Sequence, residues 1–223
     1  MAFSQPDFNF LRQQMVKVQL EERGIYDQAV LKAMGTIPRE RFVLPAYRDQ
    51  AYRDGPLPLP ANQTISQPYV VAMMLQLLEL KPENKVLEVG TGSGYAAAVL
   101  GKIVAAVHTI ERHPELVTYA RERLKQLGIT NVIVYEGDGT LGLPEEAPFD
   151  GIVVAAGGPE VPPALLAQLT VNGRLVMPVG REQRRQRMIK VTKLANGRFR
   201  RQNLGPVAFV PLIGKQGWEN KDN

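Results

Sequence analysis

Three glycines at alternate positions follow a short apolar run and precede a stretch rich in alanine. Residues 85–89 are mostly apolar, Gly90, Gly92 and Gly94 come next, and residues 96–100 are typical of a helix. Glycine suits a backbone that turns sharply or lies flat against a ligand, because no Cβ blocks the approach. The helix that follows would offer free N–H groups and the positive end of its dipole. The pattern therefore predicts a strand, a turn and a helix start that bind a nucleotide or a carboxylate.

Acidic residues stand at two points around this turn. Glu88 precedes the glycines, and Glu111 closes the next apolar run, residues 105–110. In nucleotide-binding α/β folds, an acid at the end of the second strand accepts hydrogen bonds from the ribose hydroxyls. The third glycine comes one position earlier than in the dinucleotide fingerprint G-x-G-x-x-G, which disfavours a nicotinamide oxidoreductase.

The spacing G-x-G-x-G, with an acid on each side, resembles S-adenosylmethionine-dependent methyltransferases. We expect Glu111 to hold the ribose of that cofactor. The residues expected to bind the methionine part of the cofactor are Gly90, Thr91, Gly92, Ser93 and Gly94.

A third candidate segment follows the next predicted strand. In Gly137-Asp138-Gly139, Asp138 together with Gly139 stands where an adenine amine would need an acceptor. Open α/β sheets bind ligands at the carboxyl ends of their parallel strands, where all three segments meet. The alternative is a plain turn, since Asp and Gly are common turn residues. The agreement of three strand ends favours the ligand interpretation.

From residue 67 onward, predicted helices and strands alternate. Apolar periodicity predicts strands over 85–89, 105–110, 132–135, 149–154 and 173–179, and helices over 68–80, 94–102, 114–126 and 162–169. This alternation predicts an α/β fold with a Rossmann-like, doubly wound, mostly parallel sheet and helices on both faces. Asn196-Gly197 lies between the apolar runs 187–194 and 199–211, which predicts an antiparallel hairpin at the sheet edge.

The N-terminal third has a different pattern. Residues 9–23 and 28–34 predict two helices, the second capped by Asp27, and the proline-rich residues 45–63 predict an irregular segment. We expect residues 1–80 to form a helical extension and substrate-side segment packed on the core. Residues 81–214 would form the cofactor-binding core and residues 215–223 a flexible tail, all within a single compact domain.

Composition excludes several classes of protein. The chain has 223 residues, 44% of them hydrophobic, but no apolar run that approaches the ~18 residues of a membrane helix. The first residues do not resemble a signal peptide, so we expect a cytoplasmic protein with no membrane partner. There is no cysteine, which excludes disulfides and a thiol nucleophile. His108 and His113 cannot form a zinc site without carboxylates, and we expect no metal.

The net charge of +5 comes largely from residues 181–190, which include Arg181, Arg184, Arg185, Arg187 and Lys190. One interpretation is a nucleic-acid patch. The other is a solvated edge strand, where charge discourages pairing with a second sheet. We favour the solvated strand, because no aromatic residues are interleaved for base stacking.

Ser66 lies in a second motif, residues 62–69, ahead of the glycine turn. It precedes a predicted helix that has Pro68 just inside its start. Capping that helix would by itself account for a serine at this place.

Several segments, taken with the glycine turn, resemble protein-L-isoaspartate O-methyltransferases. They are residues 38–43, 64–69, 87–95, 110–112, 137–139, 148–150, 173–180 and 209–212. The likeness covers residues 10–214, and Thr64-Ile65-Ser66-Gln67-Pro68 is its most specific part. The loop of residues 155–160 departs from the family because it contains paired glycines, Gly157 and Gly158, which puts its rigidity in doubt.

The resemblance implies a repair reaction. A methyl group would pass from S-adenosyl-L-methionine to the free α-carboxylate of an isoaspartyl residue in a damaged protein, leaving S-adenosyl-L-homocysteine. The ester would close to a succinimide, which water reopens in part as aspartate. A carboxylate with a pKa near ~4 is already ionised at neutral pH, so the transfer needs no general base.

The resemblance also assigns the substrate side. Ser66 would position the substrate carboxylate and is the candidate catalytic residue. The groove for isoaspartyl proteins and peptides would be lined by Thr64, Ile65, Ser66, Val210 and Leu212. We expect a monomer with no nucleic-acid partner. The alternatives are an RNA or small-molecule methyltransferase on the same fold, and a binding protein without catalytic activity.

Overall fold

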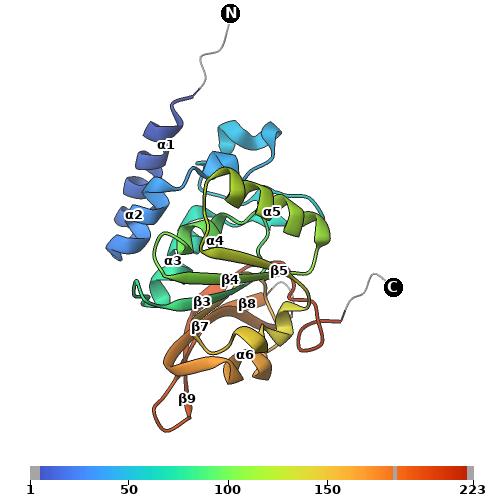
Figure 1. Cartoon of the computed structure of the whole chain (residues 1–223). Coiled ribbons are helices and arrows are strands. Elements are labelled where there is room, and N and C mark those ends of the chain that lie inside the picture. The colour runs from blue at the N-terminus through green and yellow to red at the C-terminus, as the bar shows by residue number, and fades with distance from the viewer. Residues whose placement is uncertain (1–5, 183–184, 220–223) are drawn as a thin grey trace, which may run out of the picture.

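The computed structural model describes residues 6–182 and 185–219, and a mixed sheet runs through its centre (Figure 1). Within those residues the sheet has seven strands in the order β5-β4-β3-β6-β7-β8-β9. Pairing is parallel from β5 to β7 and antiparallel for β8 and β9. The strands are β3 (Lys85–Val89), β4 (Ala106–Glu111), β5 (Val132–Glu136), β6 (Phe149–Val154), β7 (Leu169–Glu182), β8 (Arg185–Lys193) and β9 (Phe199–Val207). The predicted Rossmann-like sheet with an antiparallel edge hairpin is confirmed.

The strand order reverses beside β3. Strand β4 pairs with one side of β3 and β6 pairs with the other. The chain therefore adds strands first on one side of β3 and later on the opposite side. Such a switch point leaves a crevice at the carboxyl ends of the strands. The glycine turn follows β3 directly and therefore lies at this crevice.

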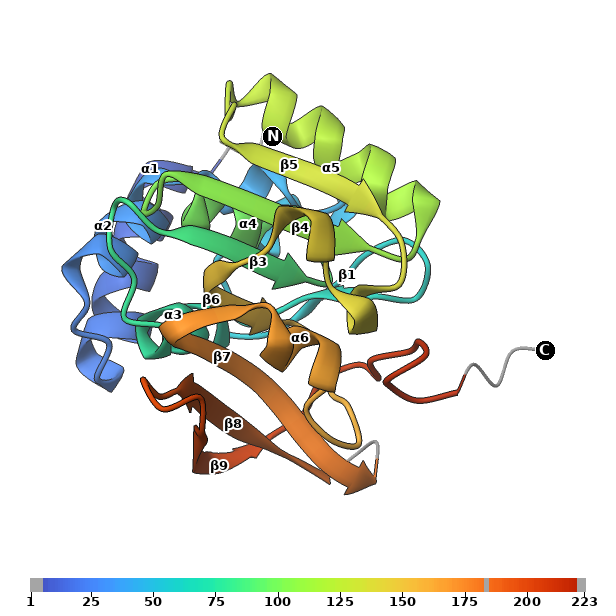
Figure 2. The ribbon, with the colours of Figure 1, turned by 60° about the horizontal axis from the view of Figure 1, so that its bottom comes forward.

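Alternate residues of β3 belong to two different cores, because successive side chains of a strand point to opposite faces. Val86 packs in the larger core with the helices α2 (Gln28–Thr36), α3 (Pro68–Leu77), α4 (Tyr95–Leu100) and α5 (Pro114–Gln126). Leu87 and Val89 pack on the other face with α6 (Pro163–Ala167). Figure 2 shows α5 and α6 on opposite sides of the sheet, so the predicted helices on both faces are confirmed.

The N-terminal segment packs beside α3 and α4 (Figure 1). Where one helix was predicted, the chain forms α1 (Phe8–Gln14), the π-helical turn η1 (Met15–Leu20) and the 3-10 turn η2 (Glu21–Arg23). Gly24 ends this run in the left-handed region, at φ 89°. Asp27 caps α2 as predicted, because its side chain accepts from the N–H groups of Ala29 and Val30.

The stretch predicted to be irregular contains more structure than its prolines indicated. The 3-10 turn η3 (Arg39–Arg41) precedes it, and it holds a second such turn, η4 (Pro45–Gln50), and a short hairpin of β1 (Leu57–Pro58) with β2 (Thr64–Ile65). The hairpin turns through Ala61 and Asn62, at φ 56° and 55°. Pro45 begins the 3-10 turn, and the later prolines tolerate the short edge strand β1, so the prediction of a wholly irregular segment was wrong.

Several predicted element boundaries also moved, and the helix predicted over 162–169 is the shorter α6, which ends at Ala167. Helix α3 ends at Leu77, and Glu79 shortly after it takes φ 51°. Strand β7 begins at Leu169, because the N–H of Phe149 already donates to the carbonyl of Gln168 there. Strand β9 ends at Val207, since the N–H of Phe209 donates to the side-chain Oε1 of Gln186 in β8 instead of to a backbone carbonyl of that strand.

The chain after β9 returns across the carboxyl ends of the strands. Pro211 bridges to Gly157, and the N–H groups of Lys215 and Gln216 donate to Asp138 Oδ2 (2.8 Å) and Thr140 Oγ1 (3.0 Å). Thr140 belongs to the 3-10 turn η5 (Gly139–Leu141), which is followed by η6 (Pro144–Glu146). Lys215, Gln216 and Trp218 of the predicted tail are thus hydrogen-bonded to the rest of the chain, and the division into an extension, a core and a tail stays a prediction.

The basic residues within 181–190 differ in their surroundings, and one of them is buried in an ion pair. Gln183 and Arg184 lie outside the described residues, and Arg185 and Arg187 are exposed. Lys190 is buried and its Nζ lies 2.5 Å from Glu79 Oε1. No helix within residues 6–182 and 185–219 is long and apolar enough to cross a membrane.

Candidate active site

One cavity of about 390 Å³ lies at the carboxyl ends of β3, β4 and β6. Its walls come from segments that are far apart in the sequence: the β1–β2 hairpin, helix α3, the glycine turn, the ends of β4 and β6, Gly139 and the returning C-terminal chain. The predicted site residues that line it are Thr64, Ile65, Ser66, Gly90, Thr91, Gly92, Ser93, Glu111, Gly139, Val210 and Leu212. The crevice predicted from the strand ends is therefore a real cavity.

The glycine turn has the backbone that its sequence requires. Gly90, Gly92 and Gly94 all lie at positive φ, at 92°, 54° and 84°. Gly94 does not line the cavity; a Cβ there would lie 3.2 Å from the Cβ of Ala120 in α5. Its place in the motif allows α4 to pack closely on α5, whereas the first two glycines form the cavity wall.

Glu111 fastens the turn to the end of β4. Its Oε2 accepts from the N–H of Gly92 (3.0 Å), and its Oε1 accepts from the N–H groups of Arg112 (2.8 Å) and His113 (3.0 Å). A carboxylate has about four acceptor sites, so these three bonds leave one for a ligand. Glu111 is buried and lines the cavity, where that remaining site suits a ribose hydroxyl.

Glu88 is the second acid in the cavity wall, and it is 1% exposed. Thr109 donates to its Oε2 (2.6 Å), and the Thr109 hydroxyl lies 2.7 Å from that of Thr91. Burial raises the pKa of Glu88 to about 8; the Thr109 hydrogen bond opposes this rise and the nearby Glu111 charge adds to it. Glu88 is thus mostly neutral at pH 7, and a cation bound in the cavity would favour its ionised form.

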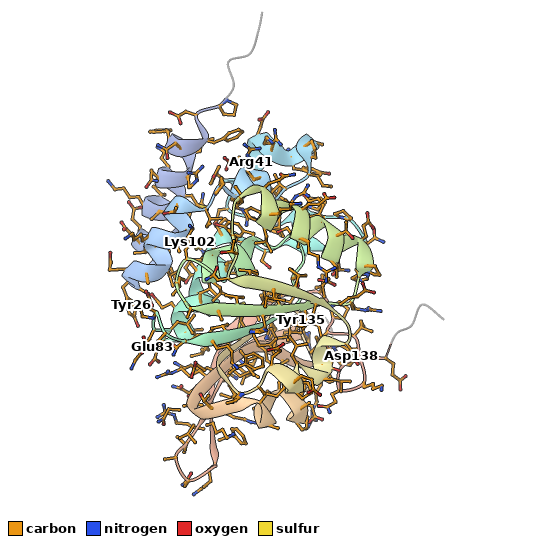
Figure 3. All side chains as sticks on the ribbon, in the orientation of Figure 1. Tyr26, Arg41, Glu83, Lys102, Tyr135 and Asp138 are labelled. Carbon is orange, nitrogen blue, oxygen red and sulfur yellow. The ribbon has the colours of Figure 1, made fainter. Side chains whose placement is uncertain are left out.

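Asp138 does not line the cavity, although Gly139 does. The Asp138 carboxylate accepts from the N–H and hydroxyl of Thr140 (2.9 and 2.6 Å) and from the N–H of Lys215. Figure 3 shows Asp138 on the side of the molecule where the C-terminal chain lies. A Cβ at Gly139 would lie 2.5 Å from Val89 Cγ1, so this position needs glycine. The adenine role of Asp138 stays a prediction.

Ser66 lies between β2 and α3 and is half-buried in the cavity wall. The N-cap of α3 is Gln67, so the alternative interpretation of Ser66 as the capping residue is wrong. Its carbonyl oxygen accepts from Arg39 Nη2 (2.8 Å). No described residue shares a hydrogen bond with its hydroxyl, which leaves that group to the cavity.

The loop with paired glycines is held firmly. The N–H of Gly157 donates to the Val210 carbonyl, and its own carbonyl accepts from the Leu212 N–H and from Trp218 Nε1 (2.8, 2.9 and 2.9 Å). A Cβ at Gly157 would lie 2.2 Å from Gln186 Nε2, so glycine is required by close packing. The departure from the family pattern therefore does not loosen the loop.

Sequence reasoning missed several residues of the cavity wall. They include Ala61, Asn62, Tyr95, His113 and Phe209. His113 lines the cavity and is also the N-cap residue of α5. Among these residues only Asn62 has a usable sequence signal. An asparagine between prolines and a strand indicates a tight turn, because Asn tolerates the left-handed region better than most residues. The others come from segments whose tertiary position the sequence pattern does not define.

Comparison with known proteins shows which family the chain resembles. Residues 11–217 match the family model described as protein-L-isoaspartate(D-aspartate) O-methyltransferase. A protein-L-isoaspartate O-methyltransferase 2 of Pelobacter propionicus is 54% identical over 209 residues, which are 94% of this chain and 93% of that protein. A protein-L-isoaspartate O-methyltransferase of Rhodopseudomonas palustris is 50% identical over 93% of this chain and 95% of its own.

Solved structures agree. A structure of a protein-L-isoaspartate O-methyltransferase superposes with a TM-score of 0.83 and 30% identity, over 92% of this chain and 67% of that one. A putative enzyme of this kind from Plasmodium falciparum, solved in complex with S-adenosyl-L-homocysteine, gives a TM-score of 0.78 and 28% identity, over 91% of this chain and 98% of that one.

The raised pKa of Glu88 predicts a pH-dependent stability difference. The folded chain keeps the Glu88 proton between about pH 4.5 and pH 8, where the unfolded chain has lost it, so the contribution of this group to stability falls as pH rises through that range. Glu88→Gln removes the titration. In thermal unfolding, its Tm relative to the wild type is expected to increase from pH 5 to pH 9.

The control is Glu83→Gln, at an exposed acid that Figure 3 labels on the surface. Its Tm is expected to follow the wild type at every pH. Parallel curves for Glu88→Gln and the wild type would contradict the assignment of a neutral Glu88.

Proposed function

Because the chain belongs to the protein-L-isoaspartate O-methyltransferase family, we propose that its cavity methylates the free α-carboxylate of isoaspartyl residues in damaged proteins and peptides. The observation that carries this proposal is the continuity of the cavity. The glycine turn with Glu111 and the segment with Ser66 line the same space, so a cofactor and a carboxylate could meet there. The resulting ester would close to a succinimide and reopen in part as aspartate.

The residues present fit S-adenosyl-L-methionine, which when bound supplies the methyl group and leaves as S-adenosyl-L-homocysteine. The methionine part would lie against Gly90 and Gly92, and the ribose on the remaining acceptor site of Glu111. The adenine would lie near Gly139, with Asp138 behind it. Support comes from Gly90 and Gly92, which line the cavity without side chains, and from Glu88 and Glu111 in the same wall, whose ionised forms favour a cationic ligand.

On the substrate side, the Ser66 hydroxyl would donate to one oxygen of the isoaspartyl carboxylate and fix its direction. Thr64, Ile65, Val210 and Leu212 would form the walls of the groove for the peptide. The carboxylate is already ionised near neutrality, so no residue has to remove a proton. Catalysis then depends on alignment and on the exclusion of water, which disfavours the charged ground state relative to the transition state.

We propose that the chain acts as a monomer, because one copy supplies every wall of the cavity. Light scattering would measure its mass in solution. Its substrates would be polypeptides in the cytoplasm and not nucleic acids.

The methyl transfer would need no metal, since its carboxylate nucleophile is ionised without one. A chelator should therefore leave the rate unchanged.

A matched pair of peptides tests the function. The two differ only in one isoaspartyl or aspartyl linkage, and both are incubated with labelled S-adenosyl-L-methionine. Base-labile labelling of the isoaspartyl peptide alone is the expected result. Labelling of neither peptide, with cofactor binding still measurable, would contradict the repair function and direct the search to RNA and small molecules.

Glu111→Gln is expected to weaken the binding of S-adenosyl-L-homocysteine by about 1–3 kcal/mol, because a charged acceptor is lost. Isothermal calorimetry measures the affinity. The matched control is Glu136→Gln, since Glu136 pairs with Glu111 in the sheet register but is exposed and outside the cavity. Equal affinities for the two variants would remove Glu111 from the cofactor site.

Ser66→Ala is expected to lower turnover of the isoaspartyl peptide by roughly 10- to 100-fold, since one oriented donor is lost. The affinity for S-adenosyl-L-homocysteine and the Tm should stay near the wild-type values, because the Ser66 hydroxyl has no partner within the described residues. Normal turnover in this variant would show that Ser66 does not position the substrate.

A further inference from the structure

Arg39 is fully buried directly behind Ser66. Its exposed fraction is 0%, although arginine is rarely found without contact to water. Nε donates to the carbonyl of Ala51 (2.8 Å), and Nη2 donates to the carbonyl of Ser66 (2.8 Å). Nη1 is buried without a well-formed hydrogen bond among the described residues, and so is the Tyr95 hydroxyl beside the guanidinium, which gives Arg39 a weak neutral partner. The guanidinium therefore ties Ser66, within the substrate-side motif, to the segment after η4 and has no carboxylate partner.

No acid of the described chain neutralises this guanidinium. Neighbouring Glu40 instead pairs with Arg12 (3.3 Å) and accepts from the hydroxyl of Tyr52. The Tyr95 ring lies over Arg39, with 4.9 Å between the guanidinium carbon and the ring centroid. Burial raises the pKa of Tyr95 to about 12, so its hydroxyl carries no negative charge at neutral pH.

Arg39 itself stays charged. Burial lowers its pKa to about 10, which is still well above neutrality. Two carbonyl dipoles and the face of an aromatic ring solvate this cation in part. A buried cation without an acid is costly in the empty protein, and an anion bound nearby would offset that cost. The cavity is lined by Ser66 and Tyr95, the two residues that Arg39 touches on that side.

We propose that Arg39 is the positioning residue of the substrate-carboxylate site: it fixes the backbone of Ser66 and places an unneutralised positive charge behind it. This inference rests on the proposed function. Arg39 does not line the cavity, so it acts through Ser66 and through its field, without touching the substrate. The charge gives the site a preference for a carboxylate over a neutral group of the same shape.

The test compares two peptides that differ only in this group. One carries the isoaspartyl α-carboxylate and the other the α-carboxamide, and the Kd of each is measured by calorimetry with S-adenosyl-L-homocysteine bound. The wild type should bind the carboxylate more tightly. In Arg39→Met this preference should fall by roughly tenfold or more, as expected when a charge is lost from a site of low dielectric. The Kd of S-adenosyl-L-homocysteine should not change.

Arg41→Met is the matched control, because Arg41 lies in the same turn η3 but is exposed, and Figure 3 labels it at the surface. It should keep the wild-type preference. A merely structural Arg39 would weaken both peptides alike, so an unchanged preference in Arg39→Met would overturn the proposal. If the wild type neither binds nor methylates the isoaspartyl peptide, the proposed function itself fails.

Arg39→Lys keeps the proposal falsifiable if Arg39→Met does not fold. Burial lowers the pKa of a lysine far more readily than it neutralises an arginine. The carboxylate preference of Arg39→Lys should therefore fall between pH 7 and pH 8.5, a range in which Arg39 of the wild type keeps its charge and its preference stays constant. A preference that is independent of pH in both proteins would contradict the role of the charge.

Discussion

The bonds that Glu111 accepts hold together the two strand ends on which the cavity is built. The carboxylate joins the N–H of Gly92, in the turn after β3, to the N–H groups of Arg112 and His113, after β4. These donors are partly buried, and the carboxylate satisfies all three of them at once. The shape of the glycine turn, the start of α5 and the position of the remaining acceptor thus follow from one side chain.

The other walls of the cavity pack around the glycine turn that Glu111 fixes. A Cβ at Gly92 would lie 3.6 Å from Leu59 Cδ1, so the β1–β2 hairpin packs on the turn that Glu111 fixes. On the other side, the C-terminal chain is fastened to Gly157 and to Asp138. Segments from both ends of the chain therefore close a crevice that the sheet alone would leave open.

Charge is distributed unevenly around this space. Glu111 lies beside the glycine turn together with Glu88, which a bound cation would ionise, whereas the positive charge of Arg39 lies behind Ser66. This arrangement suits a positively charged methyl donor on one side and a carboxylate on the other. A transfer between two such charges neutralises both of them, and it needs geometry and dryness more than it needs acid–base groups.

The sequence was sufficient for those parts of the fold and site in which local pattern and chemistry agree. The strand–turn–helix around Gly90 and the alternating elements after it needed only hydrophobic period and glycine spacing. The cap that the same reasoning offered as an alternative role for Ser66 was one residue off, because the register of a cap depends on backbone angles that composition does not define. Asp138 illustrates a second limit: its carboxylate is used by Thr140 and Lys215, and only the tertiary structure brings Lys215 there.

Gly157 and Arg39 show why the remainder was not predictable. The first is required by close contact with Gln186, and the second by a carbonyl far along the chain. Neither contact has a local signature in the sequence.

The most direct test of the account is a crystal structure of the chain with S-adenosyl-L-homocysteine and an isoaspartyl peptide. The account predicts the ribose hydroxyls within hydrogen-bond distance of Glu111 and the peptide α-carboxylate within hydrogen-bond distance of the Ser66 hydroxyl, in one continuous cavity. A carboxylate bound away from Ser66, or a nucleoside bound outside the glycine turn, would contradict it.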